Sequence, residues 1–173
     1  MRGFTLIELM IVIAILSVLA GIAIPGFSSW IPNYRLRSAA QDLYSNLQLA
    51  KLTAVKNNTN CTLTFNQTID GTTHDYVVYV DSDRDLEYTA GETVITQRRW
   101  ADYKDVSFDT IDGGGDGVSF VDNDDTYPSF SFRSNGLVVD NTGNNASGTI
   151  FLKNTKNREM DISISSTGNI RIL

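Results

Sequence analysis

Residues 4–24 form an almost uninterrupted apolar run, and this run constrains what the whole chain can fold into. Glu8 is the only charged residue within it. A helix of this length rises about 30 Å, at about 1.5 Å per residue, which matches the hydrocarbon core of a bilayer. We therefore predict a transmembrane helix over residues 4–24, with Arg2 holding the N-terminus in the cytoplasm and the C-terminal part outside.

Two other interpretations of this run fit less well. A secretory signal peptide has an apolar region of about 7–15 residues followed by a small-residue cleavage site. The run here is longer, and no such site follows it. A plain membrane anchor leaves Glu8 unexplained, because a carboxylate inside an apolar helix costs on the order of several kcal/mol unless it is neutralised or paired. We therefore expect Glu8 to have a partner.

The heptapeptide GFTLIEL at residues 3–9 resembles the processing site of type IV prepilins and type II secretion pseudopilins. The resemblance implies that prepilin peptidase cleaves between Gly3 and Phe4, which makes residues 1–3 a leader peptide, and that it then N-methylates Phe4. It also implies that the Glu8 carboxylate meets the Phe4 amine of a neighbouring subunit during filament assembly. An ammonium and a carboxylate can share a low-dielectric site that neither tolerates alone.

Residues 25–58 are predicted to continue the helix beyond the membrane. Pro25, Gly26 and Pro32 should kink or locally melt it, because proline lacks an amide donor and clashes with the preceding turn. Type IV pilins are similar in carrying a proline at the position of Pro25, and Trp30 and Tyr34 also suit a headgroup-level anchor. Farther on, apolar residues recur every three or four positions and predict an amphipathic helix that ends at the asparagines 57 and 58. Its stripe consists of Leu36, Ala39, Ala40, Leu43, Leu47, Ala50 and Ala54.

Residues 59–173 are predicted to form one periplasmic β-rich domain. Asn135 with Gly136, and Gly168 with its neighbours, are hairpin signals. The expected fold is α+β, with a long N-terminal helix packed on an antiparallel β-sheet domain, as in type IV pilins. Runs of β-branched, aromatic or alternating residues mark the candidate strands, which are 61–65, 76–80, 93–96, 106–108, 117–121, 130–132, 137–139, 149–152, 160–164 and 170–173.

Residues 38–59, together with the strand after them, are similar to the GspH/FimT branch of pseudopilins and minor pilins. That resemblance implies a non-enzymatic subunit of the bacterial inner membrane that enters a type IV pilus or a type II secretion pseudopilus. Its implied partners are prepilin peptidase, other pilins and the inner-membrane assembly platform. The alternative is a binding module at the filament tip that captures DNA or a surface. Some FimT-like pilins bind DNA through a C-terminal glycine-arginine motif, and residues 168–171 read GNIR here, with one arginine missing.

Composition narrows the chemistry further. Lys and Arg total 14 against 20 Asp and Glu, and residues 70–125 hold 15 acidic and 4 basic residues, a local net charge of −11. Such a band argues against broad contact with nucleic acid, and a cation suits it better. Cys61 is the only cysteine, which excludes an internal disulfide and a CxxC motif. His74, the only histidine, is predicted as a solvated turn residue, and no motif combines a nucleophile with a base and an orienting group.

One acidic segment has the spacing of a calcium-binding loop. Positions 1, 3, 5, 7 and 12 of a twelve-residue EF-hand loop supply oxygen ligands to Ca²⁺. Leu86 stands where that loop requires glycine, and the flanking segments look like strands instead of helices. A solvated acidic hairpin loop and a calcium site are both consistent with this pattern. The residues at the five positions are Asp81, Asp83, Asp85, Glu87 and Glu92.

Overall fold

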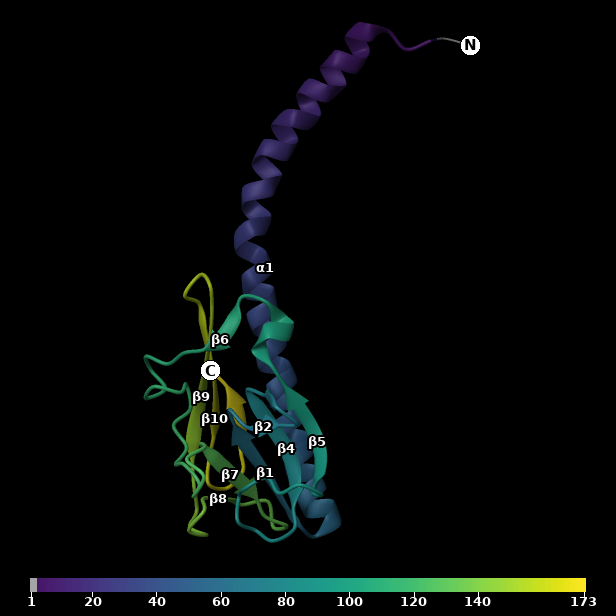
Figure 1. Cartoon of the computed structure of the whole chain (residues 1–173). Helices are drawn as coiled ribbons and strands as arrows, with labels where there is room; N and C mark the ends of the chain where they lie inside the picture. The colour runs from purple at the N-terminus through teal and green to yellow at the C-terminus, as the bar shows by residue number, and fades with distance from the viewer. Residues whose placement is uncertain (1–2) are drawn as a thin grey trace.

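A single helix, α1 (Leu6–Asn57), runs from the N-terminal end of the molecule to the far end of the β-strands (Figure 1). The computed structural model describes residues 3–173, with side chains for all of these except residues 23–29. The first part of α1 projects away from the strands, and the second part packs along them. The chain therefore has the predicted α+β fold, a long helix packed on an antiparallel β-sheet domain.

The helix continues through Pro25, Gly26 and Pro32. The predicted local melting was therefore wrong, and the helix curves smoothly instead of breaking (Figure 1). A proline inside a helix removes one hydrogen bond and displaces one carbonyl, and this local disturbance can be absorbed as curvature over adjacent turns. Pro32 is also buried against the domain, so packing supports the helix at that point.

The predicted membrane span lies in the projecting part of α1. Its last two residues, 23 and 24, fall outside the residues with described side chains. Within the described residues, no helical stretch combines the length and the apolarity needed to cross a bilayer. The hydroxyl of Ser17 donates to the carbonyl of Ile13 at 2.8 Å, so the helix itself satisfies this polar group.

The second part of α1 buries the stripe that its sequence predicts. Leu43, Leu47 and Ala50 are completely buried, and so are the other alanines of the stripe. Small side chains allow the helix to approach the strands closely, and the whole stripe joins one hydrophobic core with both large sheets. The helix ends as predicted, with Asn58 in the left-handed conformation at φ 52°.

The strands form two larger antiparallel sheets and one short hairpin. The five-stranded sheet has the order β5-β4-β1-β7-β8, with β1 (Asn60–Phe65), β4 (Tyr76–Asp81), β5 (Thr93–Arg98), β7 (Ser129–Phe132) and β8 (Val138–Val139). The four-stranded sheet has the order β11-β10-β9-β6, with β6 (Val106–Phe108), β9 (Gly148–Asn154), β10 (Glu159–Ile164) and β11 (Ile170–Ile172). The hairpin joins β2 (Thr68–Ile69) to β3 (Thr72–Thr73), and a short 3-10 helix, η1 (Trp100–Tyr103), follows β5.

Two local predictions were wrong. Residues 117–121 do not form a strand, because Gly117 takes φ +81° and the Asp116 carboxylate accepts the amide of Val118 at 3.0 Å, which leaves only an isolated bridge from Val118 to Ile150. His74 is not a solvated turn residue, since it is only 9% exposed. Its amide closes the β2–β3 hairpin by donating to the carbonyl of Gln67 at 2.8 Å.

Ion pairs and hydrogen bonds attach α1 to the domain at two places: just after the projecting part of the helix, and in the middle of the part that packs on the strands. Near the projecting part of α1, the Arg35 guanidinium pairs with Asp105. In the middle, the Asp42 carboxylate accepts from Arg98 Nε at 3.1 Å and from the Tyr103 hydroxyl at 2.7 Å. These contacts fix how α1 lies against β5, η1 and the segment before β6.

The remaining polar attachments join α1 to the four-stranded sheet. Asn33 accepts from the buried side chain of Asn154, at the end of β9, over 2.9 Å. Lys51 Nζ donates to the carbonyl of Gly168 at 2.8 Å. That lysine lies against two glycine turns, because Cβ atoms built on Gly136 and Gly168 would both lie 3.2 Å from its Cε. The distal part of α1 is thus fixed by the turns before β8 and before β11.

Candidate functional site

The residues that precede and begin α1 form a capping box. Thr5 is the N-cap residue, and its hydroxyl oxygen accepts the amide of Glu8 at 3.3 Å. In return, Glu8 Oε2 accepts the Thr5 amide at 3.1 Å and the Thr5 hydroxyl at 2.9 Å. Within a single chain, Thr5 therefore already provides hydrogen-bond donors for the Glu8 carboxylate, for which we expected a partner. The Thr-x-x-Glu spacing of a capping box signals this contact in the sequence, although it was not among our predictions.

The predicted processing residues precede the cap in an open segment. Gly3 and Phe4 lie before the first helical residue, and a Cβ built on Gly3 would meet no atom within 4 Å. Phe4 is 84% exposed. None of the residues that the structure describes covers the peptide bond between them, so this bond is open to a peptidase.

The projecting part of α1 presents apolar side chains on every face. Exposure of the large side chains remains high from Phe4 to Ile22, which is 73% exposed. A continuous apolar surface of this size on a water-soluble monomer would be unusual, and it marks a surface that contacts lipid or other protein chains. Among the described side chains of this segment, Glu8 carries the only charge.

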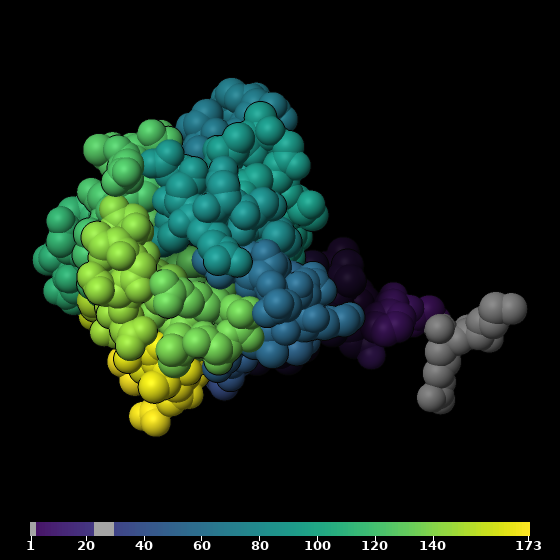
Figure 2. Space-filling view, turned by 90° about the horizontal axis from the view of Figure 1, so that it is seen from below, coloured from purple at the N-terminus to yellow at the C-terminus, as the bar shows by residue number. Residues whose placement is uncertain are grey.

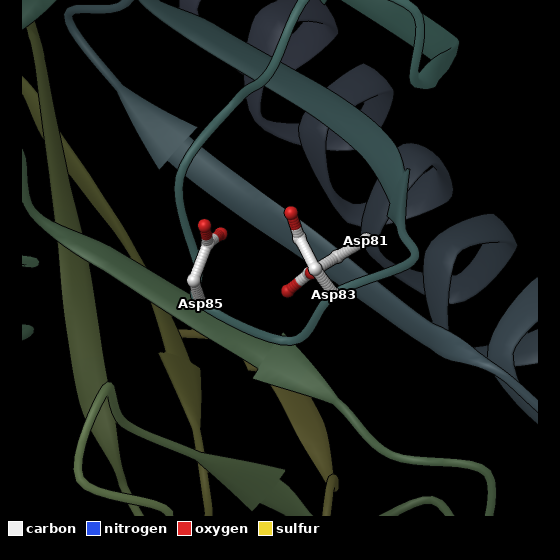
Figure 3. A group of neighbouring side chains, drawn as sticks. All are labelled: Asp81, Asp83 and Asp85. Atoms are coloured by element: carbon white, nitrogen blue, oxygen red, sulfur yellow. The ribbon is translucent and has the colours of Figure 1, made fainter.

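At the other end of the domain, the loop between β4 and β5 brings three of the five predicted calcium ligands together. Carboxylate oxygens of Asp81, Asp83 and Asp85 all lie within 4.8 Å of one another. Figure 3 shows Asp85 on the opposite side of the loop from Asp81 and Asp83. Asp81 is buried, and its carboxylate accepts from the Thr62 hydroxyl at 2.7 Å and from the Arg84 amide at 2.6 Å.

Leu86 takes the backbone conformation for which an EF-hand loop normally requires glycine. It takes φ +63°, the left-handed conformation that glycine normally supplies, and its amide donates to Asp81 at 3.3 Å. Its side chain is 2% exposed. Burial of this leucine offsets the cost of an unfavourable backbone conformation, so the loop keeps a tight turn without glycine.

The other two predicted ligands have different surroundings. Both carboxylate oxygens of Glu92 accept hydrogen bonds from the loop backbone, from the amide of Ser82 at 2.9 Å and from the amide of Thr89 at 3.1 Å. Partial burial raises the pKa of Glu92, and burial followed by the nearby Asp125 and Asp85 raises the pKa of Glu87. Burial also raises the pKa of Asp81. Several carboxylates are thus held where negative charge is disfavoured, a situation that a bound cation would relieve.

Comparison with known proteins links this architecture to one family. Residues 39–168 match the family described as Type II transport protein GspH. This chain belongs to the GspH family. Residues 1–24 match a second family, the prokaryotic N-terminal methylation motif, which covers the heptapeptide and the projecting part of α1.

Individual relatives are consistent with membership of the GspH family. A pilin-like protein of Thermus thermophilus, PilA1, is 36% identical over 106 residues, which cover 58% of this chain and 64% of that protein. The crystal structure of the type IV minor pilin FimU from Pseudomonas aeruginosa PAO1 aligns with a TM-score of 0.55. That alignment has 16% identity and covers 83% of this chain and 92% of FimU, so the likeness to FimU concerns the fold alone. The chain is therefore a type IV pilin-like member of the GspH family, and such families consist of structural subunits.

Proposed function

We propose that this subunit is cleaved between Gly3 and Phe4, N-methylated on Phe4, and assembled through α1 into a type IV pilus or a type II secretion pseudopilus. The observation that carries the proposal is the projecting part of α1. Its apolar side chains have no cover among the described residues, and one carboxylate, Glu8, lies beside them. Before assembly, the bilayer covers this surface, and afterwards the corresponding helices of neighbouring subunits do so.

The proposed location follows from the same segment. The subunit starts in the bacterial inner membrane as a single-pass protein, with Arg2 on the cytoplasmic side and the β-domain in the periplasm. Prepilin peptidase, an inner-membrane assembly platform and other pilins are its partners. Deleting the subunit distinguishes the two machines, because loss of surface pili identifies a pilus component and loss of protein export identifies a pseudopilus component.

Processing gives the first prediction. Mass spectrometry of the mature protein should show N-methylated Phe4 and no residues 1–3. Gly3→Val should block cleavage, because the peptidase must accept the residue before the cut, while the open surroundings of Gly3 leave the fold unchanged. Gly21→Ala is the matched control, since Gly21 also has no atom near its Cβ position and should be processed normally. An intact Met1 in a host with active prepilin peptidase would overturn the processing proposal.

The alternative proposal, a binding module at the filament tip, concerns the C-terminal segment. Gly168 is buried in the turn before β11, against the carbonyl of Gly136, so a packing requirement accounts for this glycine. Arg171 is exposed on β11, an edge strand of the four-stranded sheet. Retardation of DNA by the wild-type chain, and its loss in Arg171→Gln, would favour the binding role.

We also propose that the loop between β4 and β5 binds one calcium ion through Asp81, Asp83 and Asp85. The observation that favours calcium is the left-handed Leu86, which gives the loop the turn that its sequence appeared to lack. Extracellular calcium sites have dissociation constants of about 10⁻⁴–10⁻³ M. At 10 mM calcium, such a site would stabilise the folded chain by about 1.4–2.7 kcal/mol.

The second prediction tests calcium by thermal unfolding of the full chain in detergent. Calcium at 10 mM should raise the Tm by several degrees, whereas magnesium should have little effect because it requires stricter octahedral geometry. Asp83→Asn with Asp85→Asn should remove the shift, since both side chains are exposed and asparagine preserves their shape. Asp70→Asn with Asp122→Asn makes the same change in charge on exposed residues outside the cluster and should retain the shift. An unchanged wild-type Tm would leave the solvated-loop interpretation standing.

A further inference from the structure

A polar pocket opens at the end of the domain farthest from the N-terminus. The strand register places Asn60 opposite Asp81 and Cys61 opposite Phe132, so the β4–β5 loop, the turn after β7 and the loop after β8 meet at this end. Figure 2 looks onto this end of the domain. The pocket has a volume of about 420 Å³, which falls within the range of small-molecule sites. Leu86 and Val139 contribute apolar lining, and polar side chains form most of the rest.

Two arginines from distant parts of the sequence line this pocket. Arg84 comes from the β4–β5 loop, where its backbone takes φ +69° and its backbone amide donates a hydrogen bond to Asp81. Arg133 follows β7, and its Nη2 donates to the carbonyl of Gly143 at 3.0 Å. Among the described residues, neither guanidinium belongs to an ion pair. Two unpaired guanidinium groups at one pocket of an otherwise acidic chain favour an anionic ligand.

The side-chain amide of Asn60 also lines the pocket. Asn60 is 8% exposed, and its side chain makes no hydrogen bond with any described residue. Two neighbouring side-chain amides each use only one of their polar atoms in a hydrogen bond. Asn135 Oδ1 accepts the Leu137 amide, and Asn141 Nδ2 donates to Asp124. The amide atoms of Asn60 are not among the buried polar atoms that lack a hydrogen bond, so they keep access to solvent and are free to contact a ligand with donors and acceptors of its own.

The charge balance of the pocket limits the charge of that ligand. Asp140 also lines it, but one of its carboxylate oxygens already accepts the amides of Thr142 and Asn144. Two guanidinium groups and one carboxylate leave a net charge of about +1, which matches a singly charged carboxylate better than a phosphate dianion. The amides suit ligand hydroxyl groups, which both donate and accept.

We propose that this pocket binds a carboxylate-bearing sugar, with the carboxylate held by Arg84 and Arg133 and the ring hydroxyls held by Asn60 and its neighbouring amides. Bidentate pairing of guanidinium with carboxylate would supply most of the affinity, and the amides would select a hydroxylated ring. The site does not depend on filament assembly, because all of its residues belong to one chain. A subunit that fails to enter filaments would therefore still bind the sugar.

The third prediction tests this site by calorimetric titration of the full chain in detergent, with D-glucuronate as the probe. Glucuronate should bind, while glucose and inorganic phosphate should bind at least tenfold more weakly. Arg84→Gln with Arg133→Gln should weaken glucuronate binding at least tenfold, and Asn60→Ala should weaken it severalfold. Arg158→Gln with Arg171→Gln is the matched control, because it removes the same charge at exposed residues outside the pocket and should bind as the wild type does.

Each contrary outcome overturns a defined part of the proposal. Absence of glucuronate binding, or equal binding by the double arginine variant, would overturn the site. Equal binding of glucose would remove the role of the carboxylate, and equal binding of phosphate would remove the role of the sugar ring. Arg84→Gln alone guards against a folding defect, because the Arg84 side chain makes no hydrogen bond or ion pair among the described residues.

Discussion

Glu8→Leu is expected to leave membrane insertion and leader cleavage intact while removing most of the subunit's incorporation into filaments. The substitution increases the apolarity of the segment, so insertion should not suffer. Inside the proposed filament, neighbouring helices would surround position 8, and the methylated amine of a neighbouring Phe4 would be left without its carboxylate. An unpaired charge in such surroundings costs several kcal/mol. Co-purification with partner pilins, together with a piliation or secretion assay, measures the loss.

Two further variants separate pairing between subunits from the capping box. Thr5→Val removes the N-cap hydroxyl but keeps the Glu8 carboxylate, so it should cost only about 0.5–2 kcal/mol of helix stability and leave most assembly intact. Glu8→Asp keeps the charge with a shorter reach and should be milder than Glu8→Leu. If Thr5→Val impaired assembly as severely as Glu8→Leu, the start of the helix would be the cause. Wild-type assembly by Glu8→Leu would contradict the pairing mechanism.

Gly168→Ala is expected to destabilise the β-domain by about 2–5 kcal/mol, because it combines two unfavourable changes. Gly168 takes φ +74°, where alanine is strained, and its new Cβ would lie 2.2 Å from the backbone carbonyl oxygen of Gly136. The turn before β11 would have to move away from the turn before β8, and Lys51 would lose its acceptor. Urea unfolding of the full chain in detergent measures the effect.

Gly71→Ala provides the matched control for this variant. Gly71 has nearly the same backbone angle, φ +76°, but a Cβ there would meet no atom within 4 Å. It should therefore show only the backbone cost, about 1–2 kcal/mol. Equal losses for the two variants would show that backbone conformation alone explains the need for glycine, and that the close approach of the two turns has no further cost.

The parts of the fold that the sequence predicted are those with a local period. The buried face of α1 is confirmed because Leu43, Leu47 and Ala50 recur at helical spacing and belong to one core with residues of both large sheets. The helix end at Asn58 is confirmed because asparagine tolerates the left-handed conformation. By contrast, the division into two sheets depends on pairings between residues far apart in the chain, which no local pattern encodes.

The same distinction applies to the candidate sites. Asp81, Asp83 and Asp85 could be predicted together because one short loop contains them, whereas Arg84 and Arg133 meet only through the register of β1 with β4 and β7. The conformation of Leu86 could not be predicted either. Its side chain must be buried by the rest of the fold before a left-handed leucine becomes acceptable.

The polar attachments along α1 determine how the domain responds to mechanical tension. Asn33, Arg35, Asp42 and Lys51 join successive levels of the helix to different strands and loops of the domain. A force applied to the N-terminal end and directed along the helix axis would load these attachments side by side. Contacts loaded side by side share the force and must break together, whereas contacts loaded one after another break singly at a lower force. A force that pulls on α1 can thus move the whole domain without detaching its strands one by one.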